Sequence, residues 1–246
     1  MITAWIKRHY SPSRLLISAA GAVDHQALAK LLNKHLGPLS TENASRDLSP
    51  PPSRSGLWVK RRRLEQAHLV VGSDFPQAGD GRRYAASVLN LVLGGNMSSR
   101  LFQEIRERRG LAYSVYSGCT AYAGAGMLEI YAASAPDKLP EVYGLILKEL
   151  DLLGRTPLSR AELREAAGAL KTALILGGES TESRMSRLAK NEMVFGRQIS
   201  LEDSCRALDQ VEPGEIQDLA RTFWADGSLA VYALGPIKKK DMEACR

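Results

Sequence analysis

Apolar residues recur at helical spacing over most of the chain, and short apolar runs interrupt them. Spacings of three and four residues are typical of helices, whereas short apolar or alternating runs are typical of strands. The expected helices cover residues 84–93, 98–109, 137–153, 159–176, 180–195, 200–208 and 213–223. The expected strands cover residues 57–62, 67–72, 112–116, 127–134 and 228–234. This order predicts an α+β fold: a two-layer α/β sandwich with a mostly antiparallel sheet and helices packed on one face.

The first 37 residues form a short unit of their own. Residues 4–10 have the pattern of a helix tail, and Ser11-Pro12-Ser13 should end it because proline disfavours helix interiors. Residues 15–20 are expected to form an apolar strand, and residues 24–35 a helix with one leucine-rich face. So small a βα unit cannot enclose a core, so its apolar residues need a partner surface.

A polar and then proline-rich segment follows. Residues 38–55 include Pro50-Pro51-Pro52, a sequence that favours an extended, semi-rigid linker between domains. A plain surface loop within one domain is the alternative.

The stretch from Leu93 to Ser117 combines several boundary signals. Gly94-Gly95 can end one helix in the left-handed conformation, and Ser98 or Ser99 can cap the next. Leu101, Phe102 and Ile105 give that second helix its apolar face, before Gly110 ends it and a strand begins.

The literal residues of this stretch, LGGNMSSRLFQEIRERRGLAYSVYS, resemble the hallmark of the second, non-zinc domain of the insulinase/pitrilysin zinc metallopeptidases, which include the mitochondrial processing peptidases. Residues 5–39 resemble the end of that family's zinc-binding first domain, and residues 180–203 resemble its late helices. The resemblance implies three parts: the end of the zinc-binding domain (1–37), an interdomain linker (38–55) and the C-terminal inactive domain (56–246).

Composition limits the other possibilities. The 246 residues are 44% hydrophobic, which is ordinary for a soluble protein, and no apolar run is long enough to span a membrane. The three cysteines are far apart and no signal peptide is visible, so a cytoplasmic location is expected. A net charge of +6 and the run Lys60–Arg63 permit a nucleic-acid partner, but four basic residues on a strand edge are a small footprint. We therefore expect neither a nucleic-acid partner nor a membrane partner.

Zinc binding in this family requires His-x-x-Glu-His on a helix. The four histidines, His9, His25, His35 and His68, do not form this motif. We expect no metal site and no cofactor in this chain. The resemblance implies that zinc belongs to the N-terminal domain of the parent protein.

The resemblance also implies a substrate-contacting pair, an arginine and a tyrosine seven residues apart. Here the pair corresponds to Arg106 and Tyr113, whose donors could stabilise the oxygen of a scissile carbonyl. Spacing alone leaves Arg108 and Arg109 as alternatives to Arg106. Gly94-Gly95-Asn96 is a further candidate substrate-binding segment, because glycine allows close approach of a peptide backbone.

Three functions remain possible on the sequence. The favoured one is the non-zinc half of a zinc metalloendopeptidase that cleaves peptides or unfolded proteins in a chamber between two homologous domains. The alternative is a non-catalytic family member that serves as partner subunit to an active peptidase. A basic nucleic-acid-binding module ranks far below. Either peptidase function requires a zinc-binding N-terminal domain or an active partner subunit, and the incomplete first unit also predicts homo-oligomers.

Overall fold

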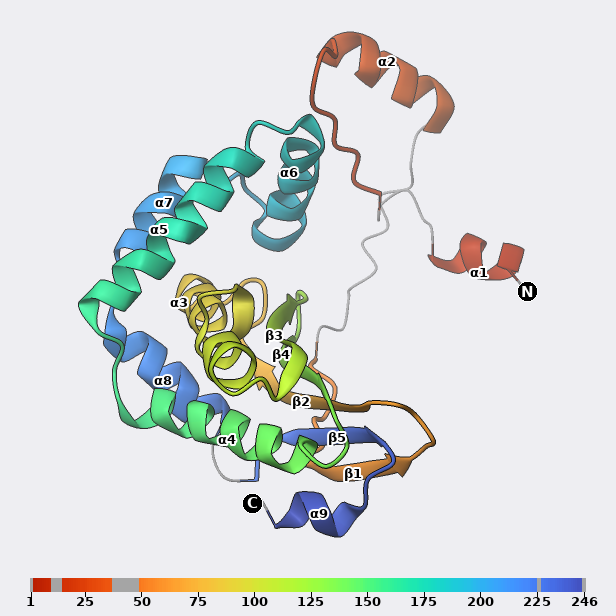
Figure 1. Ribbon diagram of the computed structural model, residues 1–246. Coiled ribbons are helices and arrows are strands. Elements are labelled where there is room, and N and C mark those ends of the chain that lie inside the picture. The colour runs from red at the N-terminus through yellow and green to blue at the C-terminus, as the bar shows by residue number, and fades with distance from the viewer. Residues whose placement is uncertain (1, 10–14, 37–48, 225–226, 245–246) are drawn as a thin grey trace. The chain divides into compact units, whose positions relative to one another are not determined.

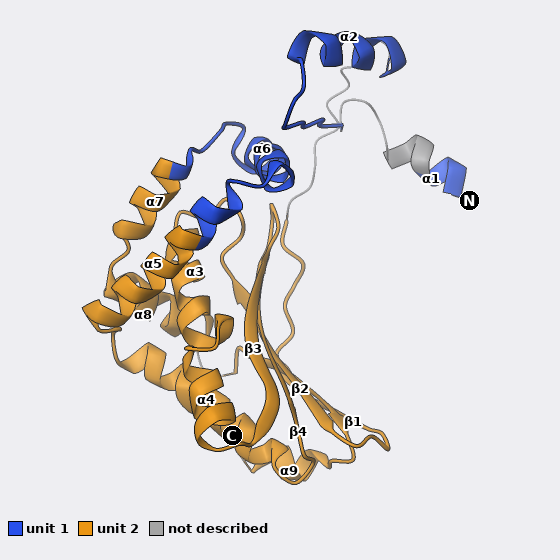
Figure 2. Ribbon diagram, turned by 45° about the horizontal axis from the view of Figure 1, so that its top comes forward, with its two compact units in different colours: residues 1–47, 173–201 blue, residues 48–172, 202–246 orange. Residues whose placement is uncertain are grey.

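The structure is a computed structural model that describes residues 2–9, 15–36, 49–224 and 227–244 (Figure 1). The expected helix break at Ser11–Ser13 and the first part of the expected linker, residues 38–48, lie outside the described residues. The chain divides into two compact units, coloured separately in Figure 2. The smaller comprises residues 1–47 and 173–201, and the larger comprises residues 48–172 and 202–246.

The larger unit is built on a five-stranded sheet with the order β1-β5-β2-β4-β3. The strands are β1 (Gly56–Arg61), β2 (Ala67–Phe75), β3 (Ala112–Ala121), β4 (Gly126–Ser134) and β5 (Ala230–Gly235). β1 and β5 run parallel, whereas β2 is antiparallel to both β5 and β4, and β4 is antiparallel to β3. The sheet is therefore mixed, where a mostly antiparallel one was expected. The parallel pair arises because the C-terminal strand inserts between β1 and β2.

Helices cover one face of this sheet (Figure 2). α4 contacts β2 and β4, α8 contacts β2, and α3 contacts β3. The helices of the larger unit are α3 (Arg83–Asn90), η2 (Leu91–Gly95), η3 (Phe102–Arg108), α4 (Leu139–Arg155), α5 (Arg160–Gly177, continuing into the smaller unit), α7 (Leu201–Asp209), α8 (Pro213–Phe223) and α9 (Lys239–Glu243). The predicted α+β class with helices on one face is confirmed. The sequence did not indicate α9, a five-residue helix with a single buried side chain, Met242.

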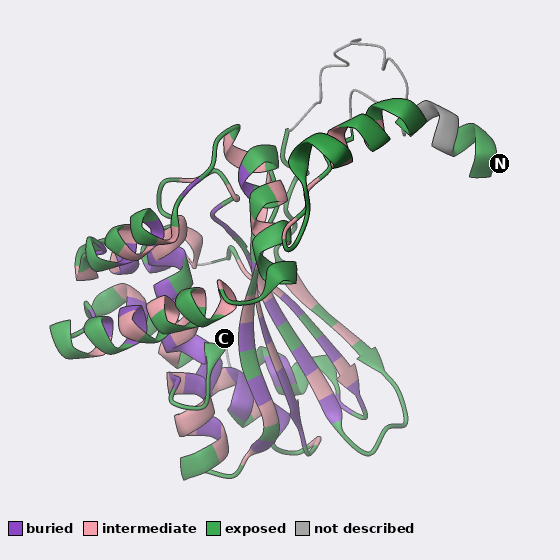
Figure 3. Cartoon of the chain, turned by 90° about the horizontal axis from the view of Figure 1, so that it is seen from above, coloured by how far each residue is buried: buried purple, intermediate pink, exposed green. Residues whose placement is uncertain are grey.

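The core lies between the sheet and these helices. Burial alternates along β2, where Leu69 and Val71 are buried. Figure 3 shows buried positions on both the strands and the helices. Leu93, Ile105 and Ile146 are fully buried on the helical side. Buried residues recur every two positions on the strands and every three to four on the helices, as the hydrophobic pattern predicted.

The opposite face of the sheet carries a row of large side chains, one from each strand. Trp58 pairs with Tyr232, Tyr232 with Val70, Val70 with Tyr131, and Tyr131 with Tyr116 in the strand register. The rings of Tyr116 and Tyr131 lie 5.2 Å apart. This face is the more solvent-exposed side of the sheet, because it carries the exposed residues Trp58, Val70, Tyr116 and Tyr232.

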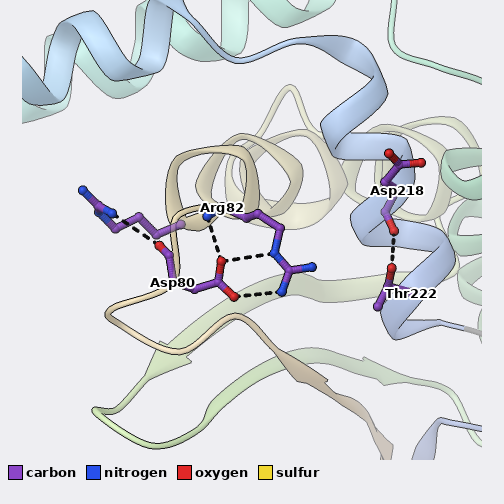
Figure 4. A network of polar contacts seen from close by, with 5 residues as sticks. Asp80, Arg82, Asp218 and Thr222 are labelled. Atoms are coloured by element: carbon purple, nitrogen blue, oxygen red, sulfur yellow. Dashed lines mark hydrogen bonds and ion pairs between the residues drawn. The ribbon is translucent and has the colours of Figure 1, made fainter.

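A short turn before α3 is fixed by an aspartate and an arginine (Figure 4). The Asp80 carboxylate accepts hydrogen bonds from the Arg82 backbone and from both Nε and Nη2 of Arg82. The Arg82 guanidinium in turn lies 5.6 Å from the centre of the Phe223 ring in α8. Hydrogen bonds from Arg82 lower the pKa of Asp80. The turn is thereby tied to the helical layer.

The smaller unit contains α1 (Ile2–His9), α2 (His25–Leu36) and α6 (Thr181–Phe195). Residues 15–20 connect to α6 through a 2.7 Å hydrogen bond from Ser18 Oγ to the Met185 carbonyl. The strand expected at residues 15–20 does not form, because the described part of this unit offers no other strand to pair with it. Among the described helices, none is long and apolar enough to cross a membrane.

Candidate functional site

The candidate site begins at the end of a π-helical segment. Over Phe102–Arg108 the helix is wider than an α-helix, and π-helical turns occur frequently at functional sites. Gly110 ends the segment with a left-handed φ of 62°. Its N–H donates to the Arg106 carbonyl at 3.0 Å, and the Leu111 N–H donates to the Ile105 carbonyl at 2.9 Å. The chain therefore turns back immediately after the helix, as the sequence predicted for Gly110.

A β-bulge then places Tyr113. Ala112 pairs with Ser134, but Ala133 pairs with Ser114, so Tyr113 is an extra residue without a partner in β4. Bulges re-aim side chains, and here the tyrosine is 77% exposed at the start of a strand whose next inward residue is buried. Ser134 Oγ donates to the Leu111 carbonyl and fixes the turn in front of the bulge.

The Arg106 guanidinium contacts two aromatic rings. Its guanidinium carbon is 4.6 Å from the centre of the Phe102 ring and 4.9 Å from the centre of the Tyr113 ring. Both distances are within the range of favourable cation–π contacts. Arg106 Nε also lies 3.7 Å from Glu107 Oε1 at the surface. The structure thus brings together Arg106 and Tyr113, the two residues that the sequence paired.

The neighbouring arginines have a different partner. Arg108 and Arg109 both bind the Glu104 carboxylate, at 3.1 Å and 2.8 Å, and Arg109 also lies 3.8 Å from Glu141. Hydrogen bonds from Arg109, and then from Arg108, lower the pKa of Glu104. Of the three arginines that spacing left open, Arg106 is the one that contacts Tyr113.

The Gly94-Gly95-Asn96 segment has a packing role in this structure. Gly94 is buried, and a Cβ at this position would lie 2.6 Å from the Ser117 backbone nitrogen, so the absence of a side chain lets the helix contact β3. Neither Gly94 nor Gly95 has the positive φ that was expected, because the helix ends in the π-helical turn η2 instead. Ser117 is four residues beyond Tyr113, or about 13 Å along the strand.

Asn96 lies in the turn before the next helix, which begins at Arg100. Its Oδ1 accepts the Ser98 N–H at 2.9 Å, whereas Ser99 Oγ donates to the Asn96 carbonyl. These bonds close the turn before the helix, and the Ser99 hydroxyl donates to a carbonyl there instead of accepting a helix N–H as a cap would. Gly95 and Asn96 are exposed and therefore accessible to a substrate. Their role in substrate binding stays a prediction.

An ion-pair network anchors the same short helix to the helical layer. Arg100 donates from Nε and Nη2 to the two carboxylate oxygens of Glu162 in α5, at 2.9 Å and 3.0 Å. Its Nη1 also lies 4.0 Å from Glu149 in α4. Burial raises the pKa of Glu149, and Arg100 acts in the opposite direction. Nothing in the sequence indicated this network, because the partners of Arg100 are 49 and 62 residues away.

The described histidines do not fit a zinc site. His25 and His35 lie ten residues apart on α2, and His68 Nδ1 is 2.8 Å from the Tyr131 hydroxyl oxygen across two strands. Within the described parts of the chain, no group of three or more His, Cys, Asp or Glu side chains could hold a metal ion.

Comparisons with known proteins place the chain in a family. A family model described as the peptidase M16 inactive domain matches residues 1–170. A protein of Mycobacterium tuberculosis named as an uncharacterized zinc protease is 39% identical over 223 residues, which are 87% of this chain and 50% of the relative. A similarly named Bacillus subtilis protein is 37% identical over 229 residues, which are 93% of this chain and 55% of the relative. The chain belongs to the peptidase M16 inactive domain family.

A solved structure supports the fold assignment. A peptidase M16 inactive domain from Pseudomonas fluorescens superposes with a TM-score of 0.77 at 20% identity, over 88% of this chain and 52% of that one. The chain spans about half the length of the curated relatives it matches.

Proposed function

We propose that this chain is the non-zinc half of a zinc metalloendopeptidase and that it grips peptide substrates in a chamber between two homologous domains. Membership of the M16 inactive domain family supports this function, as do longer relatives that are named zinc proteases and that this chain matches over about half of their length. The single observation that carries the proposal is the contact between Arg106 and Tyr113, which a glycine turn and a β-bulge bring together at an accessible position.

The chemistry of the pair suits a peptide carbonyl. Arg106 is a cation with several N–H donors, and Tyr113 has a hydroxyl donor. As a peptide bond is attacked, its carbonyl oxygen gains negative charge, and donors held in place beforehand stabilise that charge. We assign Arg106 and Tyr113 to this oxygen, and Gly95 with Asn96 to the neighbouring substrate backbone.

The partner in this proposal is a zinc-binding N-terminal domain or an active partner subunit. Zinc would supply the hydrolytic centre there, and the residues of this chain bind and orient the substrate. The histidines of this chain do not provide the donor set, so no zinc ligand is assigned to it.

The test is reconstitution. This chain is joined to the part of the Bacillus subtilis relative that it does not match, and zinc content and cleavage of a fluorogenic peptide are measured. We expect one zinc per joined protein and chelator-sensitive cleavage, and neither zinc nor cleavage for this chain alone. Stoichiometric zinc and cleavage by this chain alone would contradict the proposal. So would cleavage by the other half at the same rate without this chain.

A further inference from the structure

One aromatic residue beside the candidate site differs from its apolar neighbours. The sequence grouped Phe102 with Leu101 and Ile105 on one core-facing stripe. Leu101 and Ile105 are fully buried, but Phe102 is only partly buried and its ring faces the guanidinium of Arg106. Core packing therefore does not account for the whole of this side chain.

The two rings that contact the guanidinium of Arg106 come from two elements. Phe102 belongs to the same π-helical segment as Arg106, whereas Tyr113 belongs to β3. An arginine has many rotamers, and contacts to two rings restrict them while leaving the N–H groups at the edge of the guanidinium able to donate. Donors fixed before the substrate arrives stabilise developing charge better than mobile ones.

We propose that Phe102 is a positioning residue: with Tyr113 it holds the Arg106 guanidinium in the orientation that meets the substrate carbonyl. This inference rests on the proposed function of Arg106. The role of Phe102 is to orient Arg106, without contacting the substrate itself.

The experiment uses the joined two-domain protein with Phe102→Leu, Phe102→Tyr, Arg106→Ala and the double variant Phe102→Leu/Arg106→Ala. Leucine keeps the apolar volume and removes the ring face, so kcat/KM should fall about tenfold through kcat. Tyrosine restores the ring and should recover the rate to within about twofold. In the Arg106→Ala background, Phe102→Leu should have no further effect, because the side chain that it positions is gone.

A matched control removes the same kind of contact elsewhere. Phe223 lies 5.6 Å from the Arg82 guanidinium, far along the chain from the site. Phe223→Leu should lower the thermal unfolding temperature without changing kcat/KM. A readout that does not depend on activity comes from the side-chain Nε–H resonance of Arg106 in this chain. Ring currents shift this resonance, so in Phe102→Leu its chemical shift should move toward the value of an arginine without ring contacts.

The outcomes separate this inference from the proposed function. Wild-type rates for Arg106→Ala would overturn the assignment of Arg106 itself. A large loss for Arg106→Ala together with a silent Phe102→Leu, or with losses that multiply in the double variant, would overturn the positioning role alone. An unmoved Arg106 resonance in Phe102→Leu would also overturn it.

Discussion

The guanidinium carbon of Arg106 lies 4.9 Å from the centre of the Tyr113 ring, although the two residues come from different elements and a left-handed glycine separates them. Arg106 contacts the aromatic ring of Tyr113, and this contact does not use the tyrosine hydroxyl. Tyr113→Phe therefore removes one hydrogen-bond donor and keeps the ring that holds Arg106.

We predict that Arg106→Ala and Tyr113→Phe each lower kcat/KM of the joined two-domain protein about a hundredfold, because one oxyanion donor contributes roughly 3 kcal/mol. The two losses should be less than additive, since both donors address one oxygen. Arg108→Ala is the control and should be nearly silent, because Arg108 binds Glu104. Steady-state cleavage of one fluorogenic peptide measures all of them, with thermal unfolding as the folding check. A deep loss for Arg108→Ala would show that the wrong arginine was chosen.

The sequence predicted the fold class correctly, and the contact between Arg106 and Tyr113 is consistent with the pair that the resemblance implied, whose role at a substrate stays a prediction. Periodicity identified most helices and strands because packing against a core repeats along the chain. The choice of Arg106 over Arg108 and Arg109 came only from resemblance; the structure adds that Glu104 binds the other two arginines.

Other features of the site were not readable from the sequence. The bulge at Tyr113 depends on the register with β4, which no local pattern encodes. The substrate contact expected of Gly94 stays a prediction, and its tight approach to Ser117 could not be predicted because that strand lies more than twenty residues away. The strand expected at residues 15–20 was wrong because its apolar pattern specifies burial, whereas a strand also needs a neighbouring strand.

Glu104 should make stability depend on acid pH. Its pKa is lowered in the folded chain from an ordinary value of 4.5, so its contribution is present above that pH and is lost as the pH falls through the lowered value. The difference in unfolding free energy between wild type and Glu104→Gln should therefore shrink as the pH drops below about 4.5. Urea unfolding of both proteins between pH 7 and pH 3 measures this difference in unfolding free energy. A difference that grew on acidification would contradict the assigned direction.

Arg100→Ala should destabilise the larger unit by about 1–3 kcal/mol, because it leaves the carboxylates of Glu149 and Glu162 without their shared cation. Arg155→Ala is the matched control. Arg155 pairs with Asp151 on an exposed helix surface, and such pairs contribute about 0–1 kcal/mol. Denaturant unfolding of both variants decides the point, and equal effects would mean that the Arg100 network adds nothing beyond an ordinary surface pair.

Gly94→Ala should cost about 1–3 kcal/mol of stability, because its Cβ would lie 2.6 Å from the Ser117 nitrogen and 2.8 Å from its Oγ. Gly144→Ala is the control, since a Cβ there would meet no atom within 4 Å apart from its chain neighbours and the backbone of its own helix, α4. That substitution should stabilise the helix by up to about 1 kcal/mol. Thermal unfolding compares them. If Gly94→Ala were neutral in stability yet impaired cleavage, the substrate-binding interpretation of this glycine would regain support.

The smaller unit should make the isolated chain self-associate. Leu15, Leu16 and Ile17 are exposed, and Leu16 and Ile17 line a cavity of about 320 Å³ together with residues of α2 and α6. Exposed apolar surface of this kind favours association in water. We expect sedimentation velocity to show oligomers whose fraction rises with concentration up to ~100 μM, and Leu16→Asp to reduce them. Tyr122→Asp, at an exposed site in the larger unit, is the control and should leave association unchanged. A monomer at every concentration, or equal effects of the two substitutions, would mean that these exposed residues are not the contact surface.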